Sequence, residues 1–173
     1  MKVMKVFSVF GVSKSGKTTT IELLIRELIK RGYTVGSVKD IHFEQFAIDP
    51  PGTNTNRHKQ AGANPVTARG FNETDVMFNR QLPISEILRF YNQDYVVLEG
   101  VREPGIPAII TAHSTEELDA QRAPDIFAIS GRIAAKIDIY DGLPAIDATC
   151  DIKALTDLAE EKSADWRDIK NGG

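Results

Sequence analysis

The chain has 173 residues, 42% hydrophobic and 26% charged, which is the composition of a globular protein, and we expect one domain over residues 1–173. The formal net charge of −3 and the scattered Lys and Arg residues exclude a basic surface for a nucleic-acid partner. The sequence has no signal pattern, no apolar run of membrane length and a single cysteine, Cys150, so we expect a cytoplasmic location, no membrane contact and neither a disulfide within the chain nor a thiolate cluster.

Residues 3–10 are a near-continuous apolar run, typical of a parallel strand buried on both faces. The run is followed at once by Gly11-Val12-Ser13-Lys14-Ser15-Gly16-Lys17-Thr18, which has the spacing G-x-x-x-x-G-K-[ST]. Apolar residues then recur at helical spacing, at Ile21, Leu24, Ile25, Leu28 and Ile29. Because a strand and a helix flank the motif, the sequence predicts a phosphate-binding P-loop.

Each position of the P-loop has a physical task around a polyphosphate. Gly11 and Gly16 allow the tight turn that brings backbone N–H groups onto phosphate oxygens, and the next helix directs its positive N-terminal end at the same charge. We expect Lys17 to reach the β- and γ-phosphates and the Thr18 hydroxyl to bind Mg²⁺.

Strands and helices alternate through the rest of the chain. Apolar runs predict strands over residues 34–38, 65–69, 75–78, 95–98, 108–111 and 126–129. Capping residues and helical spacing predict helices from Thr53 or Thr55 to Ala61, over 84–91, over 114–120 with Ser114 as cap, and over 151–162. Residues 133–147 leave two alternatives open, a hairpin turning at Asp141-Gly142 or an irregular connection. The alternation predicts an α/β P-loop NTPase fold, a mostly parallel sheet with helices on both faces in three α/β/α layers.

Three candidate functional segments follow predicted strands. The P-loop follows the first strand, Lys39-Asp40 follows the second, and Glu99 ends the central run 95–98. Ligands of such folds lie at the carboxyl ends of the strands, so we expect these segments to meet in one crevice. A carboxylate at a strand end commonly organises Mg²⁺ or orients water in P-loop enzymes, which makes Glu99 the candidate for that role.

The polar, proline-containing stretch 40–52 is predicted to be an active-site loop. Asp49 of its Asp49-Pro50-Pro51-Gly52 run is either a carboxylate that holds the metal or the attacking water, or part of a proline-stiffened turn. We expect His42 and His58 to be loop or helix-surface residues because their spacing matches no compact metal motif, and His113 is given no role.

Four motifs, in this order, resemble the MobB family, the P-loop GTP-binding proteins of molybdopterin-guanine dinucleotide biosynthesis. They are the P-loop with Thr19, the segment from Val38-Lys39 to Asp49-Pro50-Pro51-Gly52, the run Arg57-His58-Lys59-Gln60-Ala61-Gly62-Ala63, and Val97-Leu98-Glu99-Gly100. The resemblance extends over about the first hundred residues, and the remainder contributes only general similarity.

The resemblance implies a GTP-binding accessory protein that uses Mg²⁺, hydrolyses GTP slowly at most, forms a homodimer and assists the molybdopterin guanylyltransferase. The nucleotide-binding residues it implies are Gly11, Ser13, Lys14, Ser15, Gly16, Lys17, Thr18, Thr19 and Lys39. The catalytic residues it implies are Lys17, Glu99 and Asp49, and the metal ligands are Thr18, Glu99 and Asp49.

The chain also departs from the family pattern. Asn54 and Thr55 follow Asp49-Pro50-Pro51-Gly52 where an acidic residue and a serine are common, and Asp40 follows Lys39 where histidines are common. Asn supplies no negative charge for a metal or a proton, so hydrolysis is impaired here if that position is catalytic in the family. The guanine-binding pattern N-K-x-D is incomplete in Ala135-Lys136-Ile137-Asp138, which we interpret as an accidental match within a strand, so GTP is implied by the resemblance alone.

Two other classes of function remain open from the residues. A small-molecule kinase would use the same P-loop and strand-end acid, although the sequence shows no arginine cluster typical of a lid. A metallochaperone GTPase that inserts nickel would need a Cys/His cluster, which the sequence lacks.

Overall fold

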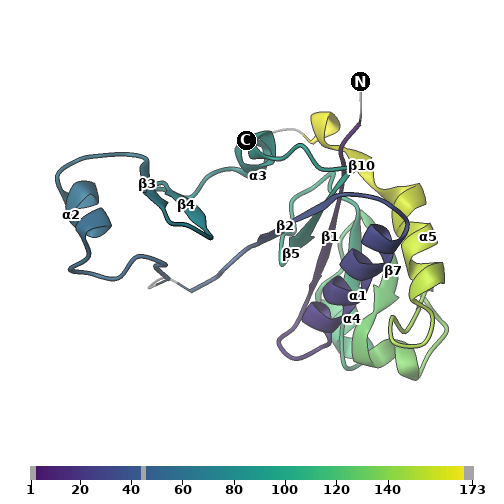
Figure 1. Ribbon diagram of the computed structural model, residues 1–173. Coiled ribbons are helices and arrows are strands. Elements are labelled where there is room, and N and C mark those ends of the chain that lie inside the picture. The colour runs from purple at the N-terminus through teal and green to yellow at the C-terminus, as the bar shows by residue number, and fades with distance from the viewer. Residues whose placement is uncertain (1–2, 44–45, 170–173) are drawn as a thin grey trace.

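The computed structural model describes residues 3–43 and 46–169, and a mostly parallel sheet forms its centre (Figure 1). Within these residues the main sheet has six strands, β1 (Lys5–Gly11), β2 (Val35–Lys39), β5 (Tyr95–Glu99), β6 (Ala108–Thr111), β7 (Ile126–Ser130) and β10 (Ala164–Asp165). Five run parallel in the order β2-β5-β1-β6-β7, and β10 pairs antiparallel with the start of β1. The strand that precedes the P-loop therefore lies in the middle of the sheet.

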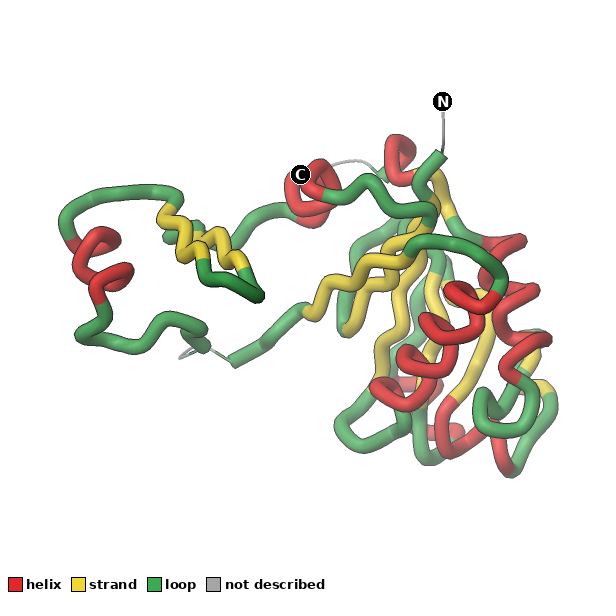
Figure 2. Tube along the Cα trace, in the orientation of Figure 1, coloured by secondary structure: helices red, strands yellow, loops and turns green. Residues whose placement is uncertain are grey.

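Side chains of β1 alternate between two cores. Phe7 and Val9 point to one face, where the fully buried Leu24 and Leu155 pack in the same cluster. The helices on this face are α1 (Lys17–Lys30) and α5 (Ile152–Lys162). Figure 2 shows these two helices side by side in front of the strands.

The opposite face of the sheet is covered by shorter helices. Val6 packs in a cluster with Leu88, and Phe10 packs in another with Leu118. The elements on this face include α3 (Ile84–Ile87), η1 (Leu88–Phe90) and α4 (Thr115–Ala120). Helices thus cover both faces, as the sequence predicts. No helix in the described part of the chain is long and apolar enough to cross a membrane.

Capping side chains fix the starts of two helices. Thr53 caps α2 (Asn54–Gln60), where its hydroxyl accepts from the Asn56 N–H at 3.1 Å. The Asp151 carboxylate accepts from the Ala154 N–H at 3.0 Å and caps α5. Ser114 occupies the N-cap position of α4, but its hydroxyl makes no cap hydrogen bond in the described structure, so the predicted cap is right in place and wrong in its bonding.

The segment after β7 resolves the alternatives left open for residues 133–147. A hairpin turns at Asp141-Gly142, whose φ angles of 51° and 78° match the mirror-image turn favoured between paired strands. Its elements are η2 (Gly131–Ala135), β8 (Ile139–Tyr140) and β9 (Leu143–Pro144). Residues 135–138 lie at the end of η2 and in the turn that follows, so the prediction that they belong to a strand is wrong.

Residues 40–43 and 46–82, which we call the arm, leave the main sheet after β2 and return before α3 (Figure 1). The arm contains α2 and a separate two-stranded sheet of β3 (Val66–Arg69) and β4 (Thr74–Met77). None of the residues of α2 is buried. The predicted strands at 65–69 and 75–78 therefore exist, but they pair only with each other.

The C-terminal segment adds two short elements that the sequence patterns do not predict. β10 is followed by η3 (Trp166–Asp168), and the Trp166 N–H donates to the Met4 carbonyl at 3.1 Å. These elements are too short for a periodic pattern, and their place depends on pairing with β1 from the far end of the chain.

Candidate functional site

The P-loop leaves the sheet at a point of very close backbone packing. A Cβ atom built on Gly11 would lie 2.0 Å from the Thr111 carbonyl oxygen, because β6 pairs with β1 up to this residue. Real Cβ atoms do not approach an oxygen this closely, so only glycine fits at the end of β1. The tight turn predicted from the motif therefore has a specific cause, which is the neighbouring strand.

The other end of the P-loop opens directly into a helix. Gly16 occupies the N-cap position of α1 with φ 101°, a conformation that L side chains rarely adopt. Glycine offers no side chain to accept from the first N–H groups of the helix, and the first turn of α1 contains no acidic residue. These N–H groups and the positive end of the helix are therefore available to an anion.

Ser15 is buried under the loop instead of facing the pocket. Its hydroxyl donates to the Val12 carbonyl at 2.8 Å and lies 2.7 Å from the Thr111 hydroxyl. The predicted nucleotide-binding role of Ser15 is thus limited to its backbone, while its side chain holds the loop on β6.

His113, to which the sequence gives no role, also contacts the loop. Its Nε2 lies 3.1 Å from the Lys14 carbonyl, and its Nδ1 lies 3.2 Å from a Glu117 carboxylate oxygen. The Glu117 carboxylate also accepts from the His113 backbone N–H, and this bond is the first cause that lowers the pKa of Glu117. His113, which lies between β6 and α4, therefore helps to position the P-loop.

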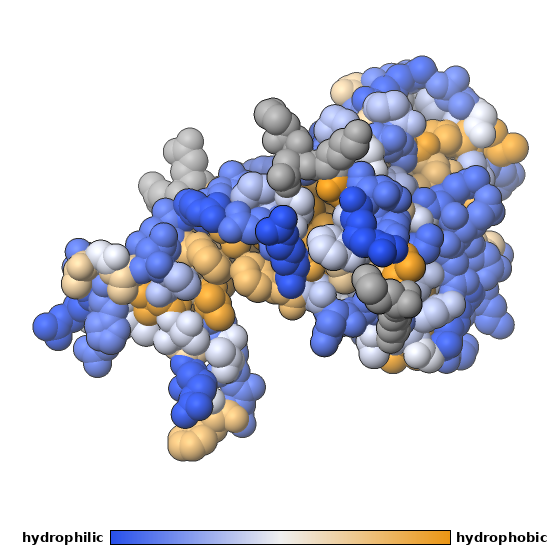
Figure 3. Space-filling view, turned by 90° about the horizontal axis from the view of Figure 1, so that it is seen from above, coloured by the Kyte–Doolittle hydropathy of each residue, from blue (hydrophilic) through white to orange (hydrophobic). Residues whose placement is uncertain are grey.

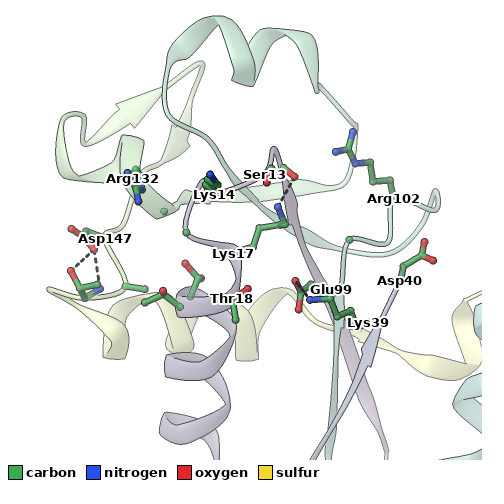
Figure 4. Close-up of a pocket in the computed structure, with 18 of the residues that line it drawn as sticks. Ser13, Lys14, Lys17, Thr18, Lys39, Asp40, Glu99, Arg102, Arg132 and Asp147 are labelled. Carbon is green, nitrogen blue, oxygen red and sulfur yellow. Dashed lines mark hydrogen bonds and ion pairs between the residues drawn. The ribbon is translucent and has the colours of Figure 1, made fainter. Parts of the chain in front are cut away.

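The predicted segments meet in a pocket of about 1020 Å³ at the carboxyl ends of the parallel strands (Figure 4). The P-loop, Lys39-Asp40 and Glu99-Gly100 all line it, as expected. Its other lining residues are Thr20, His42, Arg102, Gly131, Arg132, Ala135, Asp147, Ala148 and Thr149. The sequence reasoning missed Arg102, Arg132 and Asp147; Arg102, three residues after Glu99, was the easiest of them to find.

The pocket is basic although the whole chain is acidic. Among the described residues, five Lys and Arg side chains line it together with three carboxylates, in a chain of net charge −3. Lys17 donates to the Gly11 carbonyl at 2.9 Å and to the Val12 carbonyl at 2.5 Å. Burial lowers the pKa of Lys17, while Glu99 opposes this shift. A bound anion would raise the pKa of Lys17 again, because a nearby negative charge favours the charged form of the ammonium. The pocket therefore suits a polyphosphate.

Glu99 lies at the end of β5, directly opposite Lys39 in the register of β2 and β5. The Lys39 Nζ lies 3.2 Å from a Glu99 carboxylate oxygen, and the Glu99 side chain is only 16% exposed. Thr18, in the first turn of α1, lines the same pocket. Hydroxyl and carboxylate oxygens are the donors that Mg²⁺ prefers, so the residues present fit the predicted metal.

Asp49 does not line the pocket and lies in the arm. One oxygen of its carboxylate accepts from the hydroxyls of Thr53 at 2.5 Å and Thr55 at 2.8 Å. The Thr53 bond is the main cause that lowers the pKa of Asp49. Within the single chain, Asp49 therefore supports the start of α2. This position agrees with the alternative that Asp49 is part of a turn. The structure does not bring Asp49 to Thr18 and Glu99.

The histidines predicted to be loop or helix-surface residues lie in such positions. His42 lies in the arm, where it lines the edge of the pocket with Nε2 3.5 Å from an Asp40 carboxylate oxygen. His58 lies on α2, where it is exposed. Over residues 3–43 and 46–169, His, Cys, Asp and Glu side chains form no group of three or more that could hold a metal.

Comparison with known proteins gives a consistent set of relatives. The family model described as Molybdopterin guanine dinucleotide synthesis protein B matches residues 6–131. The chain is 27% identical to a probable molybdopterin-guanine dinucleotide biosynthesis adapter protein of Bacillus subtilis, and the match covers 83% of this chain and 85% of the relative. It is 34% identical to the corresponding adapter protein of Haemophilus influenzae, and that match covers 58% of each chain.

Solved structures agree with this fold. The crystal structure of Bacillus subtilis MobB superposes with a TM-score of 0.69 at 23% identity, covering 92% of this chain and 98% of that chain. A MobB homologue from Bacillus stearothermophilus gives a TM-score of 0.67 at 22% identity, covering 91% and 97%. At this identity the likeness shows the fold alone, and it confirms the predicted α/β architecture of a mostly parallel sheet with helices on both faces.

Replacing Lys17 by Ala is expected to weaken GTP binding about 10- to 150-fold, because a charge-assisted contact is worth roughly 1.5–3 kcal/mol. Calorimetry with GTP and Mg²⁺ measures this effect. Lys30→Ala is the matched control, since Lys30 is 72% exposed at the opposite end of the same helix. Equal affinities of Lys17→Ala and the parent protein would contradict the role of the loop.

Proposed function

The chain belongs to the MobB family of molybdopterin-guanine dinucleotide biosynthesis, and from this membership we propose that it is a GTP-binding adapter that assists the molybdopterin guanylyltransferase. The observation that best supports the proposal is the basic P-loop pocket at the carboxyl ends of β1, β2 and β5. A polyphosphate there satisfies the N–H groups at the start of α1 and the Lys17 ammonium at once.

Each side chain of the pocket has a distinct role in this proposal. Lys17 exchanges its bonds to the Gly11 and Val12 carbonyls for phosphate oxygens. Thr18 and Glu99 supply the oxygens that would hold Mg²⁺, which when bound neutralises charge on the β- and γ-phosphates. Lys39 holds the Glu99 carboxylate in place through their ion pair.

The same arrangement supports slow hydrolysis at most. Of the three carboxylates that line the pocket in the described structure, Glu99 is the one at the end of β5, and it is already paired with Lys39. Asp49 serves the start of α2, and Asn54, which is neutral, stands where family members commonly have an acid. Few groups are therefore positioned to orient an attacking water.

Replacing Glu99 by Gln is expected to leave GTP affinity within about threefold and to lower Mg²⁺-dependent phosphate release about 100-fold, since the neutral amide supplies no negative charge to hold the metal and its bound water. Glu22→Gln, an exposed substitution on α1, is the control. Turnover of Glu99→Gln equal to that of the parent protein would make Glu99 a structural residue.

The proposed function is tested by calorimetry with GTP and with ATP in the presence of Mg²⁺, with and without the candidate guanylyltransferase. We expect preference for GTP over ATP and binding of the transferase. Tight ATP binding with no affinity for the transferase would contradict the proposal. Formation of a phosphorylated metabolite, in place of free phosphate, would indicate a small-molecule kinase instead.

We further propose that the protein is a homodimer formed through the arm. Large apolar side chains are exposed on the arm in the described structure, where Figure 3 shows hydrophobic surface. They are Phe43, Phe46, Ile48, Phe71 and Val76, each at least 50% exposed. Exposed apolar patches of this kind mark interaction surfaces in soluble proteins. A second copy of the chain presents the same surface, as a two-fold interface requires.

Sedimentation velocity tests the dimer. We expect the parent protein to sediment as a dimer and the double variant Phe71→Asp/Val76→Asp as a monomer, because buried unpaired carboxylates oppose association. Ile139→Asp is the matched control, since Ile139 is 69% exposed on β8, outside the arm. A dimeric double variant would show that the interface lies elsewhere, and a monomeric parent would contradict the dimer itself.

A further inference from the structure

The pocket extends beyond the P-loop on the side away from Glu99. Figure 4 shows Lys17 and Thr18 between Glu99 on one side and Arg132 and Asp147 on the other. The expected metal and γ-phosphate positions lie at the Glu99 side, so the rest of a bound nucleotide extends toward Arg132 and Asp147. The chemistry at this second side therefore bears on the base.

The loop that contains Asp147 is held against the main sheet. Ala145 forms a parallel bridge with Ile129 of β7, and the Ile146 N–H donates to the Ile129 carbonyl at 2.9 Å. The Ser130 hydroxyl donates to the Ile146 carbonyl at 2.8 Å. Residues 147–149 thus begin at the same carboxyl edge of the sheet as the P-loop.

η2 is joined directly to the P-loop. The Arg132 N–H donates to the Ser15 carbonyl at 3.0 Å, which fixes the start of η2 against the phosphate-binding turn. Arg132 lines the pocket with its exposed side chain, and a planar guanidinium can stack on a base. The pocket therefore offers a stacking group and a carboxylate on the same side.

The Asp147 carboxylate has acceptor capacity left. Oδ1 accepts from the Thr149 N–H at 2.9 Å and from its hydroxyl at 2.7 Å, and these bonds lower the pKa of Asp147. Among the hydrogen bonds of the described residues, Oδ2 receives only a long contact of 3.6 Å from the Cys150 thiol. An ionised carboxylate is a pure acceptor with about four lone-pair positions, so it remains able to accept from a ligand.

We infer that Asp147 selects guanine, by accepting hydrogen bonds from the N1–H and N2–H groups of the base; the inference rests on the proposed binding of GTP. Adenine presents an acceptor at N1, which a carboxylate repels. The end of β7, Ser130-Gly131-Arg132-Ile133, contains no acid. The carboxylate comes instead from the next loop, which explains how this chain recognises guanine without an N-K-x-D segment.

The test uses Asp147→Asn, because Asn retains a side-chain oxygen for Thr149 and so preserves the turn. Its amide donates where the carboxylate accepts, and it therefore opposes the guanine donors and matches the C2 carbonyl of xanthine. Calorimetry with GTP, ATP and xanthosine triphosphate, each with Mg²⁺, should show GTP affinity lower by about 10- to 100-fold and higher affinity for xanthosine triphosphate.

Asp151→Asn is the matched control, since Asp151 lies four residues further on, outside the pocket, and Asn is an equally good helix cap. Unchanged GTP preference in Asp147→Asn would overturn the inference and leave the proposed function intact. A parent protein that prefers ATP would overturn both. Gain of affinity for xanthosine triphosphate also shows that the variant is folded, so a loss of GTP binding is then specific.

Discussion

The contact between Gly11 and Thr111 is the constraint on which the rest of the site depends. β6 approaches β1 so closely that a Cβ atom at Gly11 would lie 2.0 Å from the Thr111 carbonyl oxygen. The Thr111 hydroxyl also lies 2.7 Å from the Ser15 hydroxyl, on the buried side of the loop. The P-loop is therefore shaped by the strand beside it, and the helix that follows starts in a fixed direction. The loop proposed to bind phosphate is therefore built on the middle of the sheet.

Local charge separates this site from the rest of the molecule. The chain is acidic, yet Lys17, Lys39 and Arg102 face one pocket, and burial already lowers the pKa of Lys17. Lys17 donates to two carbonyl groups of its own loop. A polyphosphate bound as proposed would relieve the repulsion among these cations and would replace the loop carbonyls as the acceptors of Lys17.

Much of the fold and part of the site could be predicted from local sequence. The P-loop and the strand ends at Lys39 and Glu99 each have their cause within a few residues. The hairpin at Asp141-Gly142 is one of the two alternatives that the sequence leaves open, and the structure decides between them. The arm could not be predicted as a projection, because periodicity shows that a strand exists and not what it pairs with. Asp49 shows this limit, since its carboxylate accepts hydrogen bonds from Thr53 and Thr55 within the arm and does not reach the pocket. Asp147 reaches the site through the pairing of β7 with Ala145, and Arg132 is fixed there by the bond from its N–H to the Ser15 carbonyl. No sequence spacing reveals either contact.

The central claim is that the P-loop pocket binds a nucleoside triphosphate. A crystal structure of the protein with a non-hydrolysable GTP analogue and Mg²⁺ tests it most directly. The account predicts β- and γ-phosphates within the loop 11–18, Lys17 transferred from the Gly11 and Val12 carbonyls to phosphate oxygens, and the metal beside Thr18 and Glu99. An analogue bound elsewhere, with Lys17 still on those carbonyls, would contradict it.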